Sequence, residues 1–118
     1  MLLASHQTRP YEAHPGDTDH LVRAWTGTLS QDLAQNRNLS SSGILNRCRE
    51  MAADFQAVER APRRCKRVAV VGDLYTKYCS LGNWDLERYL EHHGCEVAIN
   101  GLTWHALYYW DTHLTGVR

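Results

Sequence analysis

The chain has 118 residues, of which 43% are hydrophobic and 22% are charged, a balance typical of one folded domain. Its 13 Lys and Arg residues are offset by 13 Asp and Glu residues, so the composition disfavours a nucleic-acid partner, which needs concentrated positive charge. No apolar run reaches the roughly 20 residues of a bilayer-spanning helix, and the first residues become polar too soon for a signal peptide. We therefore expect a cytoplasmic protein without a membrane partner.

The sequence divides into three parts. Residues 1–16 contain two prolines and a glycine and are expected to form an extended segment. Residues 17–66 are expected to form a helical hairpin followed by a basic connector, and residues 67–118 an α/β unit. Eight of the eleven aromatic residues lie at or after Tyr75, and this change in composition supports a division near residue 66.

The predicted hairpin consists of two amphipathic helices. Apolar side chains recur at four-residue intervals and predict a helix over about 18–36, capped by Asp17 or Thr18. A second helix is expected over about 41–60 and ends before Pro62. Neither helix can bury its apolar stripe alone, so the hairpin must pack on another element. The side chains expected to face inward are Leu21, Trp25, Leu29, Leu33, Ile44, Cys48, Met51, Ala52, Phe55 and Val58.

The connector carries five basic side chains within residues 60–67, among them Arg63, Arg64 and Lys66. Such a cluster can hold the phosphate groups of an anionic ligand. It is also typical of a solvated segment that keeps a strand edge soluble. Both interpretations remain open on the sequence alone.

The last part predicts a βαβα unit with parallel strands. A continuous apolar run over 68–71 predicts a strand buried on both faces, and 95–99 predicts a second strand. Asn83 is expected to cap the helix between them, Gly94 to end it, and Thr103 to cap a last helix. Two strands are too few for an independent sheet, so we expect the unit to belong to a larger one. The side chains expected to face inward from the two helices are Leu86, Tyr89, Leu90, His93, Trp104, Leu107, Tyr108 and Leu114.

A ligand cleft is expected beyond the carboxyl ends of the two strands, where open parallel sheets bind their ligands. The loop over 72–83 is long for a connection between a strand and a helix, and it is rich in aromatic residues. These aromatic residues are equally typical of ordinary packing. The cleft candidates are Gly72, Asp73, Tyr75, Lys77, Asn83, Asn100, Gly101, Thr103 and Trp104.

The four cysteines are spread along the chain and form no C-x-x-C pair. They are either reduced packing residues or members of a metal site that the fold brings together. A catalytic Cys–His pair is conceivable from Cys79 or Cys95 with His92, His93 or His105. Cys95, however, opens a buried strand, and His92 and His93 suit the C-terminal end of a helix, so no catalytic residue is assigned.

Several short motifs in a fixed order resemble a known family. They are Val-Val-Gly-Asp-Leu-Tyr at 70–75, Gly-Asn at 82–83 and Leu-Glu-His-His-Gly-Cys-Glu-Val at 90–97, preceded by Arg-Pro-Tyr-Glu at 9–12 and Gly-Asp-Thr-Asp at 16–19. Together they resemble the carboxy-terminal region of the 2-hydroxyacyl-CoA dehydratase D-component family, which includes benzoyl-CoA reductase subunits. The likeness covers almost the whole chain.

The resemblance implies a flavodoxin-like or Rossmann-like α/β domain that belongs to a lyase or reductase system of anaerobes with an iron–sulfur centre. In this family a 4Fe–4S cluster is held by cysteines from more than one domain, an ATP-dependent activator reduces it, and one electron enters a CoA thioester. Members have a ligand cysteine after the second strand, where this chain has no cysteine in residues 100–104. Asp73 also stands where members often have Glu. No cysteine of this chain is assigned as a metal ligand, although Cys79, in the loop after the first strand, could approach such a cluster.

Two functional hypotheses follow. In the first, the chain is a C-terminal domain or fragment of a dehydratase-like iron–sulfur protein, forms one wall of a cleft, and is inactive without a cysteine-bearing remainder or partner subunit. In the second, it is a small module that binds CoA or a nucleotide at the strand ends, using Gly72, Asn83 and the basic connector. A plain oligomerisation domain is a further alternative. The sequence identifies neither the substrate nor the oligomeric state.

Overall fold

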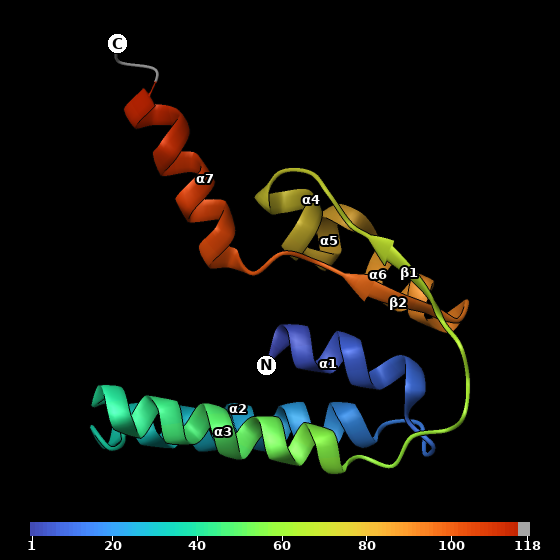
Figure 1. Ribbon diagram of the computed structural model, residues 1–118, viewed down its shortest axis with the longest axis horizontal. Coiled ribbons are helices and arrows are strands. Elements are labelled where there is room, and N and C mark those ends of the chain that lie inside the picture. Colours follow the sequence, from blue (N-terminus) through green and yellow to red (C-terminus); the bar gives the residue numbers. More distant parts are fainter. Residues whose placement is uncertain (116–118) are drawn as a thin grey trace.

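A layer of helices lies against a small α/β layer, and the last helix projects away from both (Figure 1). The computed structural model describes residues 1–115, with backbone only for 112, 114 and 115. Within this range no helix is both long and apolar enough to cross a bilayer. The elements are α1 (Leu2–Thr8), the 3₁₀ helix η1 (Arg9–Tyr11), α2 (Asp17–Ala34), α3 (Ser41–Ala57), β1 (Lys66–Ala69), α4 (Leu74–Tyr78), α5 (Ser80–Asn83), α6 (Leu86–His92), β2 (Cys95–Ala98) and α7 (Leu102–Thr115).

The two strands pair in parallel, with Lys66 opposite Cys95 and Ala69 opposite Ala98. This pairing confirms the predicted α/β fold, in which helices precede a βαβα unit. A small core forms on one face of the sheet, where side chains of α4 and α6 cover the strands. Its buried residues are Val70, Val97 and Ile99, and the half-buried residues packed on them are Tyr78, Leu86 and Leu90.

Burial of β1 on both faces is not observed, so that prediction is wrong. Val71, directly after the strand, is 77% exposed, and Lys66 and Arg67 are also exposed. The physical reason is that β1 has a single neighbouring strand, β2, among the described residues. Of the apolar residues 68–71, Val70 alone is therefore buried, and Val71 remains exposed to solvent.

Residues 2–11 are helical, so the predicted extended segment is wrong for most of its length. The stretch 2–8 contains no helix breaker, and Ser5, His6 and Thr8 are buried where α1 packs on β2, α2 and α3. Pro10 lies in the first turn of η1, where its missing N–H costs no hydrogen bond. The proline therefore redirects the helix instead of preventing it.

Glu12 caps α2 from outside the helix, in place of the predicted Asp17 or Thr18. Gly16 occupies the N-cap position with φ 103°, a conformation that favours glycine. The buried Glu12 carboxylate accepts hydrogen bonds from the backbone N–H of Gly16 at 2.8 Å and of Thr18 at 2.9 Å. A negative charge at this position also interacts favourably with the helix dipole.

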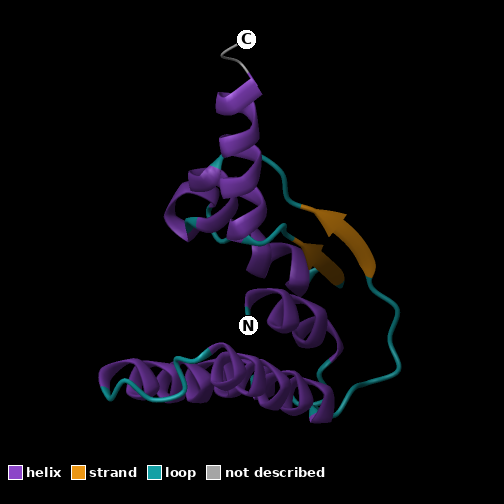
Figure 2. Cartoon of the chain, turned by 60° about the vertical axis from the view of Figure 1, so that its left-hand side comes forward, coloured by secondary structure: helices purple, strands orange, loops and turns teal. Residues whose placement is uncertain are grey.

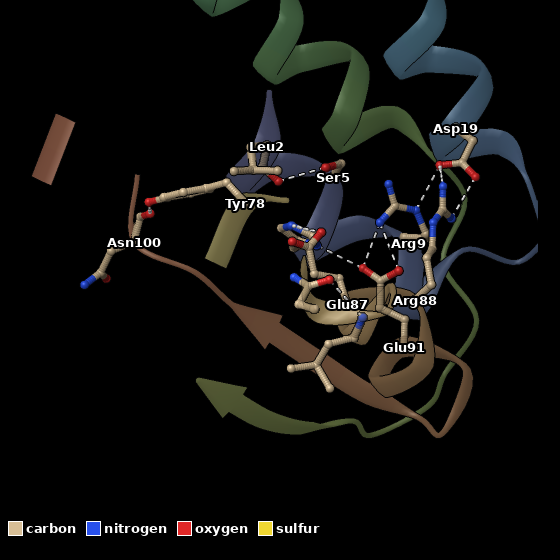
Figure 3. Close-up of polar contacts among 12 residues, drawn as sticks. Leu2, Ser5, Arg9, Asp19, Tyr78, Glu87, Arg88, Glu91 and Asn100 are labelled. Carbon is tan, nitrogen blue, oxygen red and sulfur yellow. Dashed lines mark hydrogen bonds and ion pairs between the residues drawn. The ribbon is translucent and has the colours of Figure 1, made fainter. Parts of the chain in front are cut away.

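A charged network fastens α6 to the N-terminal helices (Figure 3). Arg9 donates to both carboxylate oxygens of Glu91, at 2.8 and 2.9 Å, and to Asp19 at 3.0 Å. Arg88 reaches Asp19 at 2.9 Å, and His6 Nδ1 lies 3.0 Å from Glu91. Partial burial raises the pKa of Asp19, but hydrogen bonds and charges of Arg88 and Arg9 outweigh it and lower the pKa below its usual value. The network therefore joins α6 to three N-terminal elements, α1, η1 and α2.

The predicted inward faces are correct only where another element covers them. Trp25 and Phe55 are buried in the hairpin, whereas Leu33 and Ile44 are more than half exposed and Cys48 is exposed. Figures 1 and 2 show why: the hairpin extends past α1, which covers only part of it.

Helix α6 ends as predicted but begins later. Gly94 has φ +74° directly after the C-cap residue, as expected for a helix stop. The Asn83 side chain accepts from the backbone N–H of Leu86 at 3.4 Å, but Asp85 holds the N-cap position. Leu86 and Leu90 pack on the core as predicted, whereas Tyr89 and His93 are exposed.

Glu96 on β2 is expected to make the fold sensitive to acid. The hydrogen bond from Tyr11 at 2.7 Å, and then the hydrogen bond and charge of Arg67, lower the pKa of this buried carboxyl below 4.5. Such a carboxyl stabilises the fold above its unfolded-state pKa, and the contribution is lost as pH falls through the folded-state pKa. Urea unfolding from neutral pH to below 4.5 should show this loss, and Glu96→Gln should reduce the pH dependence. An unchanged pH dependence in the variant would contradict the assignment.

Candidate functional site

A cleft of about 330 Å³ opens at the carboxyl ends of β1 and β2. Its walls come from the segments that follow the two strands, from α4 and from the first turns of α7. This is the edge of the sheet at which the sequence predicted a ligand cleft. The lining residues are Val70, Val71, Gly72, Lys77, Asn100, Trp104, His105 and Tyr108.

Lys77 is the most buried charged group in the cleft wall, with 8% of the residue exposed. Its Nζ lies 3.4 Å from His105 Nδ1 and 5.3 Å from the centroid of the Tyr78 ring. Among residues 1–115, no carboxylate forms an ion pair with Lys77. The cleft therefore holds a buried ammonium group next to a second basic side chain.

Residues 72–78 position Lys77. Gly72 has φ +140°, and a Cβ at this position would lie 3.2 Å from the Thr76 side chain. Asp73 then caps α4 by accepting from the backbone N–H of Thr76 at 2.7 Å. The hydrogen bonds from Thr76 lower the pKa of Asp73, and the charge of His105 adds a smaller effect in the same direction. The Tyr78 hydroxyl donates to the carbonyl of Asn100, which ties α4 to the segment leading into α7 (Figure 3).

The structure brings only part of the predicted set together. Asp73 serves as a helix cap, and the Tyr75 ring lies over Gly82, where a Cβ would clash with it at 2.3 Å. Asn83 donates from its side-chain amide to the carbonyl of Thr76 at 2.9 Å, so its role is structural. The predicted residues that do line the cleft are Gly72, Lys77, Asn100 and Trp104.

The start of α7 differs from the prediction. The helix begins at Leu102, with the carbonyl of Gly101 accepting from the backbone N–H of Trp104 at 3.0 Å, so Thr103 is not its cap. Gly101 and Thr103 are exposed and do not line the cleft.

Sequence reasoning missed four of the lining residues, which are Val70, Val71, His105 and Tyr108. The spacing of Trp104, His105 and Tyr108 places them on neighbouring positions of one helix, and this signal depends on knowing where α7 begins. The inward packing predicted for Trp104, Leu107 and Tyr108 is wrong, since all three are more than half exposed. The Leu114 side chain lies outside the described residues.

The basic connector does not reach this cleft. Arg63, Arg64 and Lys66 are exposed and lie before or at the first residue of β1, at the end of the sheet opposite the cleft. Arg63 Nη2 lies 3.4 Å from the carbonyl oxygen of Glu12, on the side of the helical layer. The structure therefore does not combine Gly72, Asn83 and the connector into one anion site.

The four cysteines are the residues of this chain that could hold the iron–sulfur cluster implied by the family resemblance. Cys48 lies on α3, Cys65 precedes β1, Cys79 separates α4 from α5, and Cys95 begins β2; all four are free thiols. In the part of the chain that the structure describes, no three His, Cys, Asp or Glu side chains are placed to hold a metal ion. A cluster usually needs three or four thiolates in one site. The residues present therefore do not fit an iron–sulfur cluster held by this chain alone.

Comparison of the chain with family models, curated proteins and solved structures finds no match. The family resemblance thus rests on the order and spacing of the short motifs.

Proposed function

We propose that this chain is an α/β assembly unit of a 2-hydroxyacyl-CoA dehydratase-like protein. It forms one wall of a cleft and has no turnover of its own. The cysteine-bearing part of the system, on a partner subunit or on the rest of a longer polypeptide, covers its apolar surface. The observation that carries this proposal is the exposed aromatic surface of α7.

Helix α7 projects from the body of the molecule (Figures 1 and 2), and more of its residues are apolar than polar. Its large hydrophobic side chains are between 56% and 70% exposed. A large contiguous apolar surface is normally covered by another element or a partner, because its exposed apolar area is costly in water. These side chains are Leu102, Trp104, Leu107, Tyr108, Tyr109 and Trp110.

The sheet supports the same conclusion. In the described part of the chain it has two strands, so each strand has one edge without a neighbour. Parallel sheets are normally covered on both faces and contain more strands, since two strands alone are marginal. An additional strand beside β1 would also cover Val71, which is 77% exposed.

The order of the sequence motifs supports the choice of a 2-hydroxyacyl-CoA dehydratase-like protein. The motif at 70–75 follows β1 and enters α4, the motif at 82–83 ends α5, and the motif at 90–97 covers the end of α6 and the start of β2. The first of them lines the cleft, and the other two lie on the elements that complete the βαβ unit.

The proposal predicts a complex that depends on α7. The chain is produced under anaerobic conditions together with the cysteine-bearing dehydratase-like polypeptide, and the complex is measured by size-exclusion chromatography and light scattering. Trp110→Glu and Leu107→Glu should abolish the complex, since a charge would be buried in an apolar interface. Both side chains are exposed in the free chain, so its unfolding free energy should change by less than about 0.5 kcal/mol.

The matched control is Leu33→Glu. Leu33 is 64% exposed at the far end of the hairpin, so this change adds the same charge to a different apolar surface. The control should form the complex like the parent chain. A complex that tolerates both α7 variants, or a parent chain that forms none, would contradict the proposal.

A further inference from the structure

We propose that the cleft at the strand ends binds a small organic anion. Its phosphate or carboxylate group would contact Lys77 and His105, and a planar apolar body would lie along Val71, Trp104 and Tyr108. This goes beyond the assembly role, because it concerns a ligand held by the residues of this chain.

The first argument is that the Lys77 ammonium group has few hydrogen-bond partners and no counter-charge. An ammonium group has three hydrogen-bond donors, and His105 Nδ1 can accept only one of them. The Tyr78 ring, 5.3 Å from Nζ, gives a weaker cation–π contact. Within residues 1–115 Lys77 has no ion pair, although only 8% of the residue is exposed. A buried charge without a counter-charge is unfavourable, and an anion in the cleft would supply one.

The second argument is that the neighbouring acidic group is occupied. The carboxylate of Asp73 accepts from the backbone N–H of Thr76 at 2.7 Å and caps α4. Asp73 interacts through its charge with His105, but it forms no ion pair with Lys77 among the described residues, so the Lys77 ammonium group keeps no counter-charge.

The third argument is the shape and chemistry of the rest of the cleft. Its volume, about 330 Å³, is at the lower end of the range for small-molecule pockets, which suits a single ring with one anionic substituent. Val71 is 77% exposed and Trp104 is 68% exposed, and both line the cleft. They offer apolar surface next to the two basic side chains.

Calorimetric titration of the full chain with four probes tests the inference. Phenyl phosphate and phenylacetate carry the two anionic groups on one ring, benzyl alcohol carries the ring without charge, and inorganic phosphate carries the charge without a ring. Binding of phenyl phosphate or phenylacetate supports the inference, and the tighter of the two identifies the anionic group. Failure of both to bind at millimolar concentration, or equal binding of benzyl alcohol, would overturn it.

Two substitutions localise the site. Lys77→Gln should weaken binding of the better anion about tenfold or more, because it removes a charged donor. Lys66→Gln is the matched control, since Lys66 is an exposed lysine at the opposite end of β1, and it should leave binding unchanged. Equal binding by the Lys77→Gln variant would overturn the inference.

The unliganded chain gives an independent test. Lys77→Met removes the buried charge and keeps the length of the side chain, so the midpoint of thermal unfolding should rise without ligand. A lower midpoint would show that the fold itself satisfies the ammonium group and would overturn the inference. Both tests use this chain alone, so their outcome is separate from that of the assembly experiment.

Discussion

Replacing Arg9 with alanine is expected to lower the unfolding free energy by about 3–5 kcal/mol, because it leaves Glu91 buried without its main cation. The Glu91 side chain is 6% exposed and receives two hydrogen bonds from Arg9, at 2.8 and 2.9 Å. Arg9 also contacts Asp19 at 3.0 Å, so the substitution removes a link between η1, α2 and α6. Urea unfolding followed by circular dichroism measures the change.

The control for this prediction is Arg49→Ala. Arg49 makes an exposed hydrogen bond to Asn46 at 3.2 Å, and its loss should change stability by less than about 0.5 kcal/mol. The double variant Arg9→Met with Glu91→Leu should be more stable than either single variant, since it leaves no buried charge unpaired. Equal effects of Arg9→Ala and Arg49→Ala would show that the network does not stabilise the fold.

Replacing Glu12 with alanine is expected to lower the unfolding free energy by about 2–4 kcal/mol, because two backbone donors lose their acceptor. The buried carboxylate accepts from Gly16 at 2.8 Å and from Thr18 at 2.9 Å, at the start of α2. Glu12→Gln keeps one carbonyl acceptor and should lose less stability than the alanine variant. Hydrogen exchange of the Gly16 and Thr18 amides reports the loss directly.

Glu59→Ala is the matched control for Glu12. The Glu59 side chain is 75% exposed and lies 3.6 Å from His14, so its removal should have little effect on stability. If the Gly16 and Thr18 amides exchange equally slowly in the Glu12→Ala variant and the parent chain, the capping role is wrong.

The parallel βαβα order could be predicted because its signals are local. The apolar run at Val68–Val71 and the stop at Gly94 depend on a few neighbouring residues, and both indicated the correct type of element. Helix α1 was missed because Pro10 was taken to prevent helix formation, whereas it lies in the first turn of η1. Helix-breaking residues such as proline and glycine predict where a helix ends more reliably than whether a helix forms.

The cleft was predicted in position but only partly in composition. The edge of the sheet follows from the topology, so Gly72, Lys77, Asn100 and Trp104 were found. The contact of Lys77 with His105 joins residues 28 positions apart and depends on tertiary structure, which no spacing rule provides. The buried faces predicted for α7 failed for a related reason, since amphipathic reasoning assumes that some element covers the helix.

Hydrogen exchange along α7 tests the central claim, that another polypeptide surface covers this helix. Backbone amides of Leu102–Thr115 are followed in the free chain and in the complex with the cysteine-bearing partner. We predict that these amides become strongly protected in the complex, whereas those at the far end of the hairpin, around Leu33, keep their exchange rates. Equal protection of α7 in the free chain and in the mixture would contradict the account.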